Sequence, residues 1–463
     1  MSLYEKQVKI YPRAVRGWFA RWRWVLVWLT QLVFYGLPWL AWNGRQAMLF
    51  DLDERRFFVF GLVLYPQDFI YLTALLVIAA LGLFFFTALA GRLWCGYACP
   101  QTVYTEIFLW VEHRIEGDRL ARMRLDRAPW GLDKLWRKGA KQLVWVVIAL
   151  LTGFTFVGYF TPIRALTLEL AQLNISPWQL FWVLFYGFAT YGNAGYMREQ
   201  VCKYICPYAR FQSALIDKDS MIITYDLGRG EPRGSRSRKA DVGQLGLGDC
   251  IDCTLCVQVC PTGIDIRHGL QNECIGCAAC IDVCNGVMDK MGYAPGLIRY
   301  STENGVVNHW SRLQMFRRAL RPRVLIYGLV LTALSAAFAL SLALRSPFHL
   351  DVIKDRNTLA RMVEDGRIEN VYRLQIMNST ERAQQYQVRV SGLAGLETIG
   401  PSTFSVPAAQ IGSVSIRLQL PPEAAAPVQG RSNQILFEVT QAGTAAEAAK
   451  VVREKSIFFV PLH

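Results

Sequence analysis

The sequence lacks the motifs of the commonest nucleotide and nucleophile sites. It contains no Walker phosphate-binding motif and no GxSxG motif, and Gly246 and Gly248 stand too isolated to form a nucleotide-binding loop. No nicotinamide or flavin motif is detectable, and the long apolar segments hold no pair of histidines that could bind haem. These absences exclude P-loop, dehydrogenase and serine-hydrolase chemistry, and they exclude a haem route across a membrane.

Cysteine is also absent after Val324, so no disulfide is required there. Most of the cysteines are concentrated in one short segment. Eight of the twelve cysteines lie between residues 250 and 284, as CIDCTLCVQVCP followed by CIGCAACIDVC. Three thiolates two residues apart, with a fourth supplied by the other run, are typical ligands of a [4Fe–4S] cluster. The spacing therefore predicts two clusters bound crosswise. One is assigned to Cys250, Cys253, Cys256 and Cys284, and the other to Cys274, Cys277, Cys280 and Cys260.

Zinc and disulfides fit these runs less well. Zinc usually takes cysteines as two separated CxxC pairs, whereas here a tight triplet occurs twice. Disulfides would require an oxidising compartment. The runs differ at one point, because Pro261 follows the first and Asn285 follows the second. That difference concerns the turn after Cys284 and leaves the ligand set unchanged.

The composition is too apolar for an ordinary soluble protein. Hydrophobic residues make up 52% of the 463 positions, and the mean hydropathy is positive. Uncharged apolar runs close to the length of a bilayer crossing predict five membrane spans. They cover residues 24–42, 69–90, 143–160, 178–196 and 324–344. The fourth is short and contains Gln179 and Asn193, but its many aromatic residues are typical of an interface-anchored or protein-packed helix.

The formal charge of +14 is distributed as in a membrane protein, so nucleic acid is not expected as a partner. Six Lys or Arg precede the first span and ten lie between residues 90 and 141, whereas residues 161–177 contain only Arg164. Short loops rich in Lys and Arg stay in the cytoplasm. We therefore expect a multi-pass protein of the bacterial inner membrane, with the ferredoxin-like segment in the reducing cytoplasm and the C-terminal region in the periplasm.

Composition and patterning divide the chain into seven segments. Residues 345–463 alternate apolar and polar positions with period two and are punctuated by Pro and Gly, which predicts an antiparallel β-sandwich. The other segments are a cytoplasmic N-terminus (1–23), a helical membrane region with four spans and two CxxxCP motifs (24–225), a flexible basic loop (226–242), a bacterial-type 2[4Fe–4S] ferredoxin domain (243–295), a connector (296–323) and the fifth span (324–344).

The remaining four cysteines form two copies of a CxxxCP motif. Cys95 and Cys99 follow the second span, and Cys202 and Cys206 follow the fourth. Each pair is expected at the cytoplasmic edge of the membrane, and proline at the next position predicts that the second cysteine caps a new helix. A helix N-terminus lowers the pKa of a thiol, which favours metal binding or redox chemistry at Cys99 and Cys206.

The residues alone leave several interpretations of the two CxxxCP motifs open. Two pairs at equivalent places could form a copper site, a dithiol/disulfide couple or a third cluster, or they could be inert buried cysteines. His113 and His268 are more simply surface histidines than ligands. Met288 and Met291 lie near the cluster runs but are more simply core residues.

Taken together, four motifs resemble those of the CcoG family, also named FixG or RdxA, of membrane-bound polyferredoxins. They are RLWCGYACPQTVY (92–104), REQVCKYICPYARFQ (198–212), the double ferredoxin run and MGYAPGLIRYSTEN (291–304). The resemblance covers nearly the whole chain and implies that the C-terminal domain is immunoglobulin-like. It also implies that the eight cysteines from Cys250 to Cys284 are cluster ligands and that the four CxxxCP cysteines take part in copper chemistry.

The function that this resemblance implies is that of a cupric reductase. The family is expected to reduce Cu(II) to Cu(I) during assembly of the cbb3-type cytochrome c oxidase, with copper as substrate and oxidase assembly factors or copper chaperones as partners. Two other functions remain open: a quinol-linked electron-transfer subunit that feeds a periplasmic reductase, and a redox-sensing assembly scaffold. The electron donor is not indicated by any motif.

Overall fold

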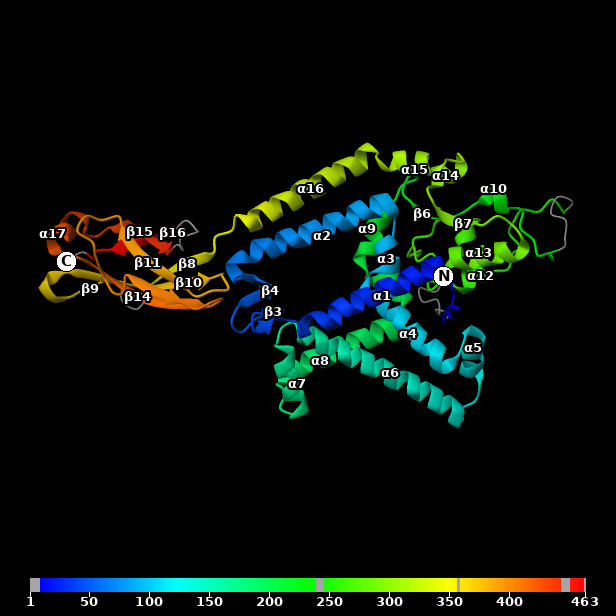
Figure 1. Ribbon diagram of the computed structural model, residues 1–463, viewed down its shortest axis with the longest axis horizontal. Helices are drawn as coiled ribbons and strands as arrows, with labels where there is room; N and C mark the ends of the chain where they lie inside the picture. The colour runs from blue at the N-terminus through cyan, green and yellow to red at the C-terminus, as the bar shows by residue number, and fades with distance from the viewer. Residues whose placement is uncertain (1–8, 239–244, 356–358, 443–449, 462–463) are drawn as a thin grey trace, which may run out of the picture. The chain divides into compact units, whose positions relative to one another are not determined.

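A computed structural model describes residues 9–238, 245–355, 359–442 and 450–461 (Figure 1). The chain forms two compact units. The first comprises residues Met1–Trp39 and Leu72–Phe338, and the second comprises Leu40–Tyr71 and Ala339–His463. The earliest hydrophilic loop of the chain is thus grouped with the C-terminal region.

Three helices of the described chain are long and apolar enough to cross a membrane. They are α2 (Phe69–Ala90), α6 (Leu132–Val157) and α16 (Pro322–Ala343). Their apolar side chains are largely exposed on the protein surface, as expected of a surface that meets lipid. These helices coincide with the second, third and fifth predicted spans, and they identify a membrane protein.

The other two predicted spans are not borne out as long apolar helices. The first becomes α1 (Trp18–Gly36), which begins earlier than expected, carries Arg21 and Arg23, and ends before Pro38. The fourth becomes α8 (Pro177–Thr190), which has only 14 residues and continues into a π-helix, η3 (Tyr191–Met197). Of the five expected spans, the described chain therefore shows three as long apolar helices.

Helices α6 and α8 pack closely against each other. A Cβ atom added at Gly153 of α6 would lie 2.2 Å from the carbonyl oxygen of Val183 of α8, so only glycine permits this approach. Four shorter helices lie between α2 and α6 or follow η3. They are α3 (Leu93–Tyr97), α4 (Pro100–Glu116), α5 (Arg119–Arg127) and α9 (Pro207–Leu215), with α7 (Ile163–Ala171) between α6 and α8.

A buried carboxylate ties these helices together. Glu112 of α4 is only 2% exposed and lies within 3.0 Å of Arg122 of α5, 2.7 Å of Arg198 and 3.6 Å of Lys141 of α6. Burial alone would raise the pKa of Glu112, but these cations outweigh it and hold the pKa below its usual value. The network fixes α4, and with it the first CxxxCP motif, against the rest of the unit.

The cysteine-rich region folds as a small module with short elements. Strands β6 (Ile222–Tyr225) and β7 (Ile298–Ser301) pair antiparallel beside α12 (Leu255–Gln258), the 3-10 turn η5 (Ile266–His268) and α13 (Ala279–Met291). Helix α14 (Glu303–Val307) and helix α15 (Arg312–Ala319) then lead to α16. The module also anchors α1, because the carboxylate of Asp282 in α13 accepts hydrogen bonds from the amides of Phe19 (3.2 Å) and Ala20 (2.8 Å).

The basic stretch before this module is not the solvated loop expected from its composition, at least over residues 226–238. It includes a short helix, α10 (Leu227–Gly230), and its arginines are used in contacts. Arg229 pairs with Asp249 at 2.5 Å, and Arg236 donates to the hydroxyl of Tyr293 and to the carbonyl of Gly248. From the sequence alone, arginines that make such contacts cannot be distinguished from arginines that face solvent. Residues 239–242 of the predicted loop lie outside the described residues.

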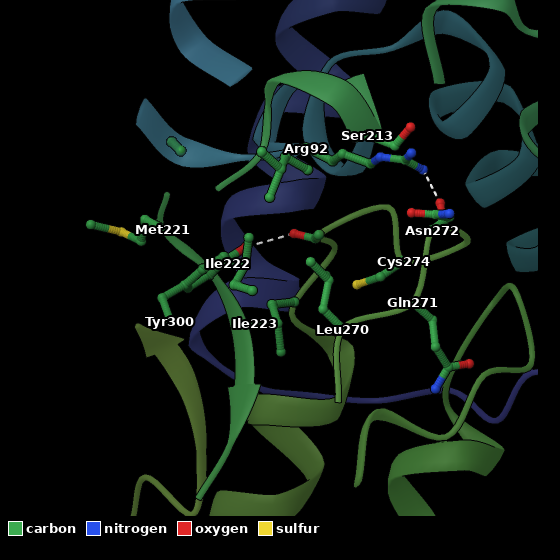
Figure 2. A pocket seen from close by; sticks show the side chains of 13 residues that line it. Arg92, Ser213, Met221, Ile222, Ile223, Leu270, Gln271, Asn272, Cys274 and Tyr300 are labelled. Atoms are coloured by element: carbon green, nitrogen blue, oxygen red, sulfur yellow. Dashed lines mark hydrogen bonds between the residues drawn. The ribbon is translucent and has the colours of Figure 1, made fainter. Parts of the chain in front are cut away.

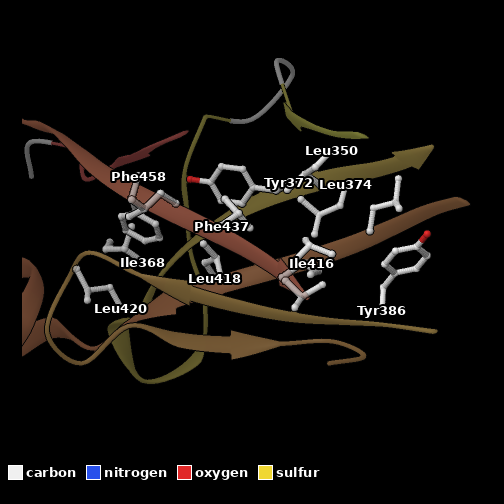
Figure 3. Packing of buried hydrophobic residues seen from close by; sticks show 14 of the residues in the cluster. Leu350, Ile368, Tyr372, Leu374, Tyr386, Ile416, Leu418, Leu420, Phe437 and Phe458 are labelled. Carbon is white, nitrogen blue, oxygen red and sulfur yellow. The ribbon is translucent and has the colours of Figure 1, made fainter. Parts of the chain in front are cut away.

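The C-terminal region is a sandwich of two antiparallel sheets, as predicted. One sheet has the order β12 (Glu397–Ile399), β14 (Ile411–Leu420), β10 (Ile368–Asn378), β8 (Phe348–Lys354), with β9 (Arg361–Met362) also on β10. The other has the order β13 (Thr403–Val406), β11 (Gln384–Ser391), β15 (Ser432–Gln441), β16 (Val451–Phe459). Apolar side chains of both sheets, including Tyr372, Phe437 and Phe458, meet in one core (Figure 3).

Glu369 is a buried charge within this sandwich. It is 1% exposed, accepts a hydrogen bond of 2.6 Å from Gln419, and pairs with Arg361. Burial alone would raise the pKa of Glu369, but these two partners hold it below its usual value. The carboxylate therefore contributes stability that depends on pH.

The loop between α1 and α2 packs into the same unit as the sandwich. It forms a three-stranded sheet of β3 (Met48–Asp51), β4 (Arg56–Val59) and β5 (Leu62–Leu64), beside a short pair β1 (Ala41–Trp42) and β2 (Arg45–Gln46). Leu49, Phe58 and Tyr65 share a buried cluster with Met377, and the Tyr65 hydroxyl donates to the carbonyl of Asn378 at 2.9 Å. The unit is therefore built from two distant parts of the chain.

Candidate metal centres

The first cavity of the cysteine-rich module gathers four thiols from both runs. They belong to Cys250, Cys253, Cys256 and Cys284. The first two lie in the loop before α12, the third lies in α12, and the fourth lies in α13. Most of the remaining lining is apolar and comprises Ile251, Leu255, Val287, Met288, Leu297 and Ile298. An apolar wall of this kind limits access of water to whatever the thiols hold.

The second cavity gathers the other four thiols of the module. They belong to Cys260, Cys274, Cys277 and Cys280, and Cys256 also reaches its wall. Three come from the second run and one from the first, so the two cavities collect the same two groups of four that the spacing assigns. The cavities share Cys256 in their walls, which makes them direct neighbours.

The backbone repeats the same turn in both runs. Thr254 and Ala278 each follow the second cysteine of a run, adopt positive φ angles of 56° and 59°, and precede α12 and α13. Non-glycine residues rarely adopt this conformation, and such strain is concentrated at functional sites. The turn places the third cysteine of each run at the start of a helix, beside the other two.

Burial leaves these thiols poorly suited to carry free negative charge. It raises the pKa of Cys256 to about 11 and the pKa of Cys274 and Cys284 to about 12. A bound metal deprotonates its thiol ligands outright, so the four-thiol cavities are suited to a positively charged iron core. The residues present therefore fit two iron–sulfur clusters.

The two CxxxCP motifs form a third group of thiols. Cys99 is the N-cap of α4 and Cys206 is the N-cap of α9, and Pro100 and Pro207 begin those helices, as predicted. Cys95 lies in α3, and Cys202 lies in a short π-helix, η4 (Val201–Ile205). The thiol of Cys202 lies within electrostatic range of the other three. The structure therefore brings both pairs together in one place.

The expected lowering of the thiol pKa at Cys99 was wrong. The nearby amides of Gln101 and Thr102 favour the thiolate, but burial outweighs them and raises the pKa of Cys99. Burial likewise raises the pKa of Cys95 to about 11 and that of Cys202 to about 12. Sequence could show the helix start but could not show how deeply it is buried.

The third group of thiols directly adjoins the second cavity. Cys95 and Cys202 pack against a buried cluster that contains Ile275 and Cys277. Gly96 makes the approach possible, because a Cβ atom there would lie 2.8 Å from the carbonyl oxygen of Ile275 and 2.9 Å from the backbone of Cys277. Only backbone separates the two sites at this point.

Three residues that the sequence did not single out organise this junction. Arg92 is 8% exposed and donates to the carbonyl oxygens of Asn272 and Ala209. Gln212 is fully buried and lies 3.5 Å from the sulfur of Cys95. Tyr300 donates to the carbonyl oxygen of Gly276 at 2.5 Å. Arginine and glutamine within the quoted motifs were the only signal that could have found the first two.

A cavity lies on the other side of this junction. Figure 2 shows Arg92, Ser213, Met221, Leu270, Cys274 and Tyr300 around it, between the end of α2 and the loop of the cysteine-rich module. Its lining is both apolar and polar. The cavity gives a small molecule a way to approach Cys274, a member of the second group of four thiols.

The histidines and the methionine considered as further ligands occupy the surface and core positions that we expected for them. Met288 is 1% exposed in the module core, and His113 is partly exposed, 4.0 Å from Asp118. His268 is exposed at the end of η5. Within the described residues, no three side chains of His, Cys, Asp or Glu converge closely enough to hold a single metal ion.

Comparison with known proteins extends these observations. Three family models match: a 4Fe-4S binding domain over residues 72–117, a 4Fe-4S dicluster domain over 197–303, and the IG-like fold at the C-terminal of FixG over 338–461. The two iron–sulfur matches together contain all twelve cysteines. Two unconnected regions of the chain thus carry iron–sulfur signatures.

Curated relatives match over most of their length. The chain is 39% identical to the nitrogen fixation protein FixG of Rhizobium meliloti (strain 1021), an alignment that covers 87% of this chain and 83% of FixG. It is 38% identical to protein RdxA of Cereibacter sphaeroides, with 98% of each chain covered. It is 41% identical to protein RdxB of the same organism, with 85% and 84% covered.

Proposed function

This chain belongs to the family of FixG, RdxA and RdxB, and from that premise we propose that it is an electron-transfer protein that reduces Cu(II) to Cu(I) for assembly of a cbb3-type cytochrome c oxidase. Its iron–sulfur character follows from the family and from the two matching domains. We further propose copper as the substrate. The proposed partners are the oxidase and its assembly factors or copper chaperones.

One observation carries the proposal: the membrane-edge thiols lie directly against the second four-thiol cavity. Gly96 brings the Cys95 segment onto the backbone of Cys277, and the two cavities of the module are themselves neighbours. An iron–sulfur cluster supplies one electron at a time, which is the number that Cu(II) needs. The order of sites gives a short path from the module to soft sulfur ligands, which favour Cu(I).

Each cysteine has a role in this proposal. Cys250, Cys253, Cys256 and Cys284 hold one cluster, and Cys260, Cys274, Cys277 and Cys280 hold the other. Cys95, Cys99, Cys202 and Cys206 form the exit from which the electron reaches copper. The apolar walls of both cavities exclude water, and Arg92 supplies positive charge between the second cavity and the exit thiols.

The proposal includes five membrane crossings, with the cysteine-rich module inside and the sandwich outside. Helix α2 ends and α16 begins at the module side, where Arg321 donates to the carbonyl of Ala88 at 2.8 Å. The 14 residues of α8 and the seven of η3 form one continuous helical segment, which can return the chain after α6. Arg21 lies in the first turn of α1, where an arginine can reach the interface, and Arg23 is buried and pairs with Glu106 at 3.1 Å.

The test is anaerobic mixing of dithionite-reduced, desalted protein with Cu(II) while a Cu(I) chelator is monitored. We expect Cu(I) to form in proportion to the reduced clusters. The variant Cys280→Ala should lower the yield, whereas Tyr204→Phe, whose side chain is 65% exposed, should not. Equal Cu(I) formation by protein stripped of iron would refute the proposal.

A second candidate function is quinol-linked electron transfer. The cavity of Figure 2 favours it, because that cavity lies at the end of α2, combines apolar and polar walls, and reaches Cys274. Anaerobic addition of a short-chain quinol to the oxidised protein in detergent would bleach the cluster absorbance if this function holds. A lack of bleaching would reject it.

A further inference from the structure

We propose that Cys95, Cys99, Cys202 and Cys206 together bind a third four-iron cluster, shared between two segments about a hundred positions apart in the chain. This inference deepens the exit site of the proposed function and rests on its electron-transfer role. It does not depend on copper being the acceptor.

The first support is that the two pairs form one site. The sulfur of Cys202 interacts with those of Cys95, Cys99 and Cys206, and Cys95 interacts with Cys99 and Cys206. Each pair has the same construction, with the second cysteine as an N-cap and proline at the first helical position. Four thiols from two matched halves are the ligand number of a cubane cluster.

The second support is the packing of the two motifs against each other. Cys95 and Cys202 pack against the same buried cluster, which contains Cys277. Gln212, in the helix that Cys206 caps, lies 3.5 Å from the sulfur of Cys95. The two CxxxCP motifs therefore meet at one place beside the second cavity.

The third support is the surroundings of the thiols. Cys99 lies at the N-terminus of α4 beside the amides of Gln101 and Thr102, and N–H groups near sulfur stabilise ligands of clusters. The guanidinium of Arg92 acts on Cys95 and Cys202 as well as on Cys274. One fixed positive charge therefore serves both the CxxxCP thiols and the second cavity, which suits two neighbouring anionic sites.

The consequence is a row of three electron carriers. The CxxxCP site takes one electron from the adjoining second cavity and gives one electron to the acceptor, so that no bond is formed or broken and no proton moves. Gly96 sets the separation between the two sites through its contact with Cys277.

The test is an iron and acid-labile sulfide count on full-length protein purified anaerobically and reconstituted with iron and sulfide. We expect about twelve irons and about twelve sulfides per chain, where two clusters alone would give about eight. Cys99→Ala and Cys206→Ala should each lose about four irons, and the double variant should also lose only about four, because the site is shared. Tyr204→Phe, in the spacer of the second motif, is the matched control and should keep the full count.

The wild-type count keeps the test decisive even if a variant misfolds. A reconstituted wild type with about eight irons, or with about ten, would overturn the inference, as would losses that add up in the double variant. Mössbauer spectra provide a second measurement, in which the expected result is a third of the iron signal missing from each alanine variant. Cu(II) reduction measured on the same samples separates the two proposals, because activity with about eight irons would leave the proposed function standing while the third cluster falls.

Discussion

Replacing Gly96 with alanine should disturb the junction between the CxxxCP thiols and the cysteine-rich module. The new Cβ atom would meet the carbonyl oxygen of Ile275 at 2.8 Å and the backbone of Cys277 at 2.9 Å, whereas ordinary contact begins at 3.4 Å. These are backbone atoms, so no side chain can rotate away. The two segments must therefore separate by about 0.5 Å, and overpacking of this kind costs about 1–3 kcal/mol.

A matched control is available in α6. Gly139 is also helical, but a Cβ atom there would meet nothing within 4 Å. Gly139→Ala should therefore stabilise the protein by about 0.5–1 kcal/mol through helix propensity alone. The difference between the two variants isolates the cost of the clash.

The assay is the thermal midpoint of the visible cluster absorbance in detergent, combined with the Cu(II) reduction rate. Gly96→Ala should lower the midpoint by several degrees and slow reduction, because the exit thiols move away from the second cavity. Gly139→Ala should leave the rate unchanged. A Gly96→Ala protein as stable and as active as the Gly139→Ala protein would contradict the steric clash at this junction.

Three further predictions concern buried carboxylates. Glu112→Gln should destabilise the protein by about 3–5 kcal/mol in thermal or chemical unfolding, because buried cations lose their partner, whereas Asp133→Asn in an exposed pair should cost less than about 1 kcal/mol. Asp282→Ala should cost about 0.5–2 kcal/mol through loss of the cap on α1, and Asp282→Asn should recover most of it. The folded-state pKa of Glu369 is lowered, so its stabilisation is complete above about pH 4.3 and is lost as the pH falls through the folded-state pKa. Calorimetry of a fragment spanning residues 345–463 should therefore show the gap between wild type and Glu369→Gln narrowing in acid, and a constant gap would contradict the assigned partners.

Local pattern was enough to predict much of the fold. Alternating residues such as Tyr372 and Leu374 indicated the strands of the sandwich, and Pro100 and Pro207 indicated the helix starts. These signals work because the side-chain periodicity of a strand and the missing amide of proline are properties of a few neighbouring residues.

Properties that depend on distant residues could not be predicted in this way. The pKa of Cys99 depends on burial by segments far along the chain, and the convergence of two CxxxCP motifs is a tertiary contact. The interruption of the fourth predicted span could not be predicted for a related reason, because η3 continues α8 in a geometry that apolar length does not reveal. Arg92 lies within a quoted motif, but no local pattern indicates its role, because its partners are the carbonyl oxygens of Ala209 and Asn272.

The packing of the α1–α2 loop against the sandwich has a consequence for biogenesis. Residues 40–65 leave the ribosome long before residues 345–463, so their apolar face, including Leu49 and Phe58, must wait for Met377 to be synthesised. During that interval the loop exposes an apolar surface that a chaperone could bind and shield. The last domain to be translated thus completes the fold of an early loop, and a chain truncated before β10 would leave that loop open to proteolysis.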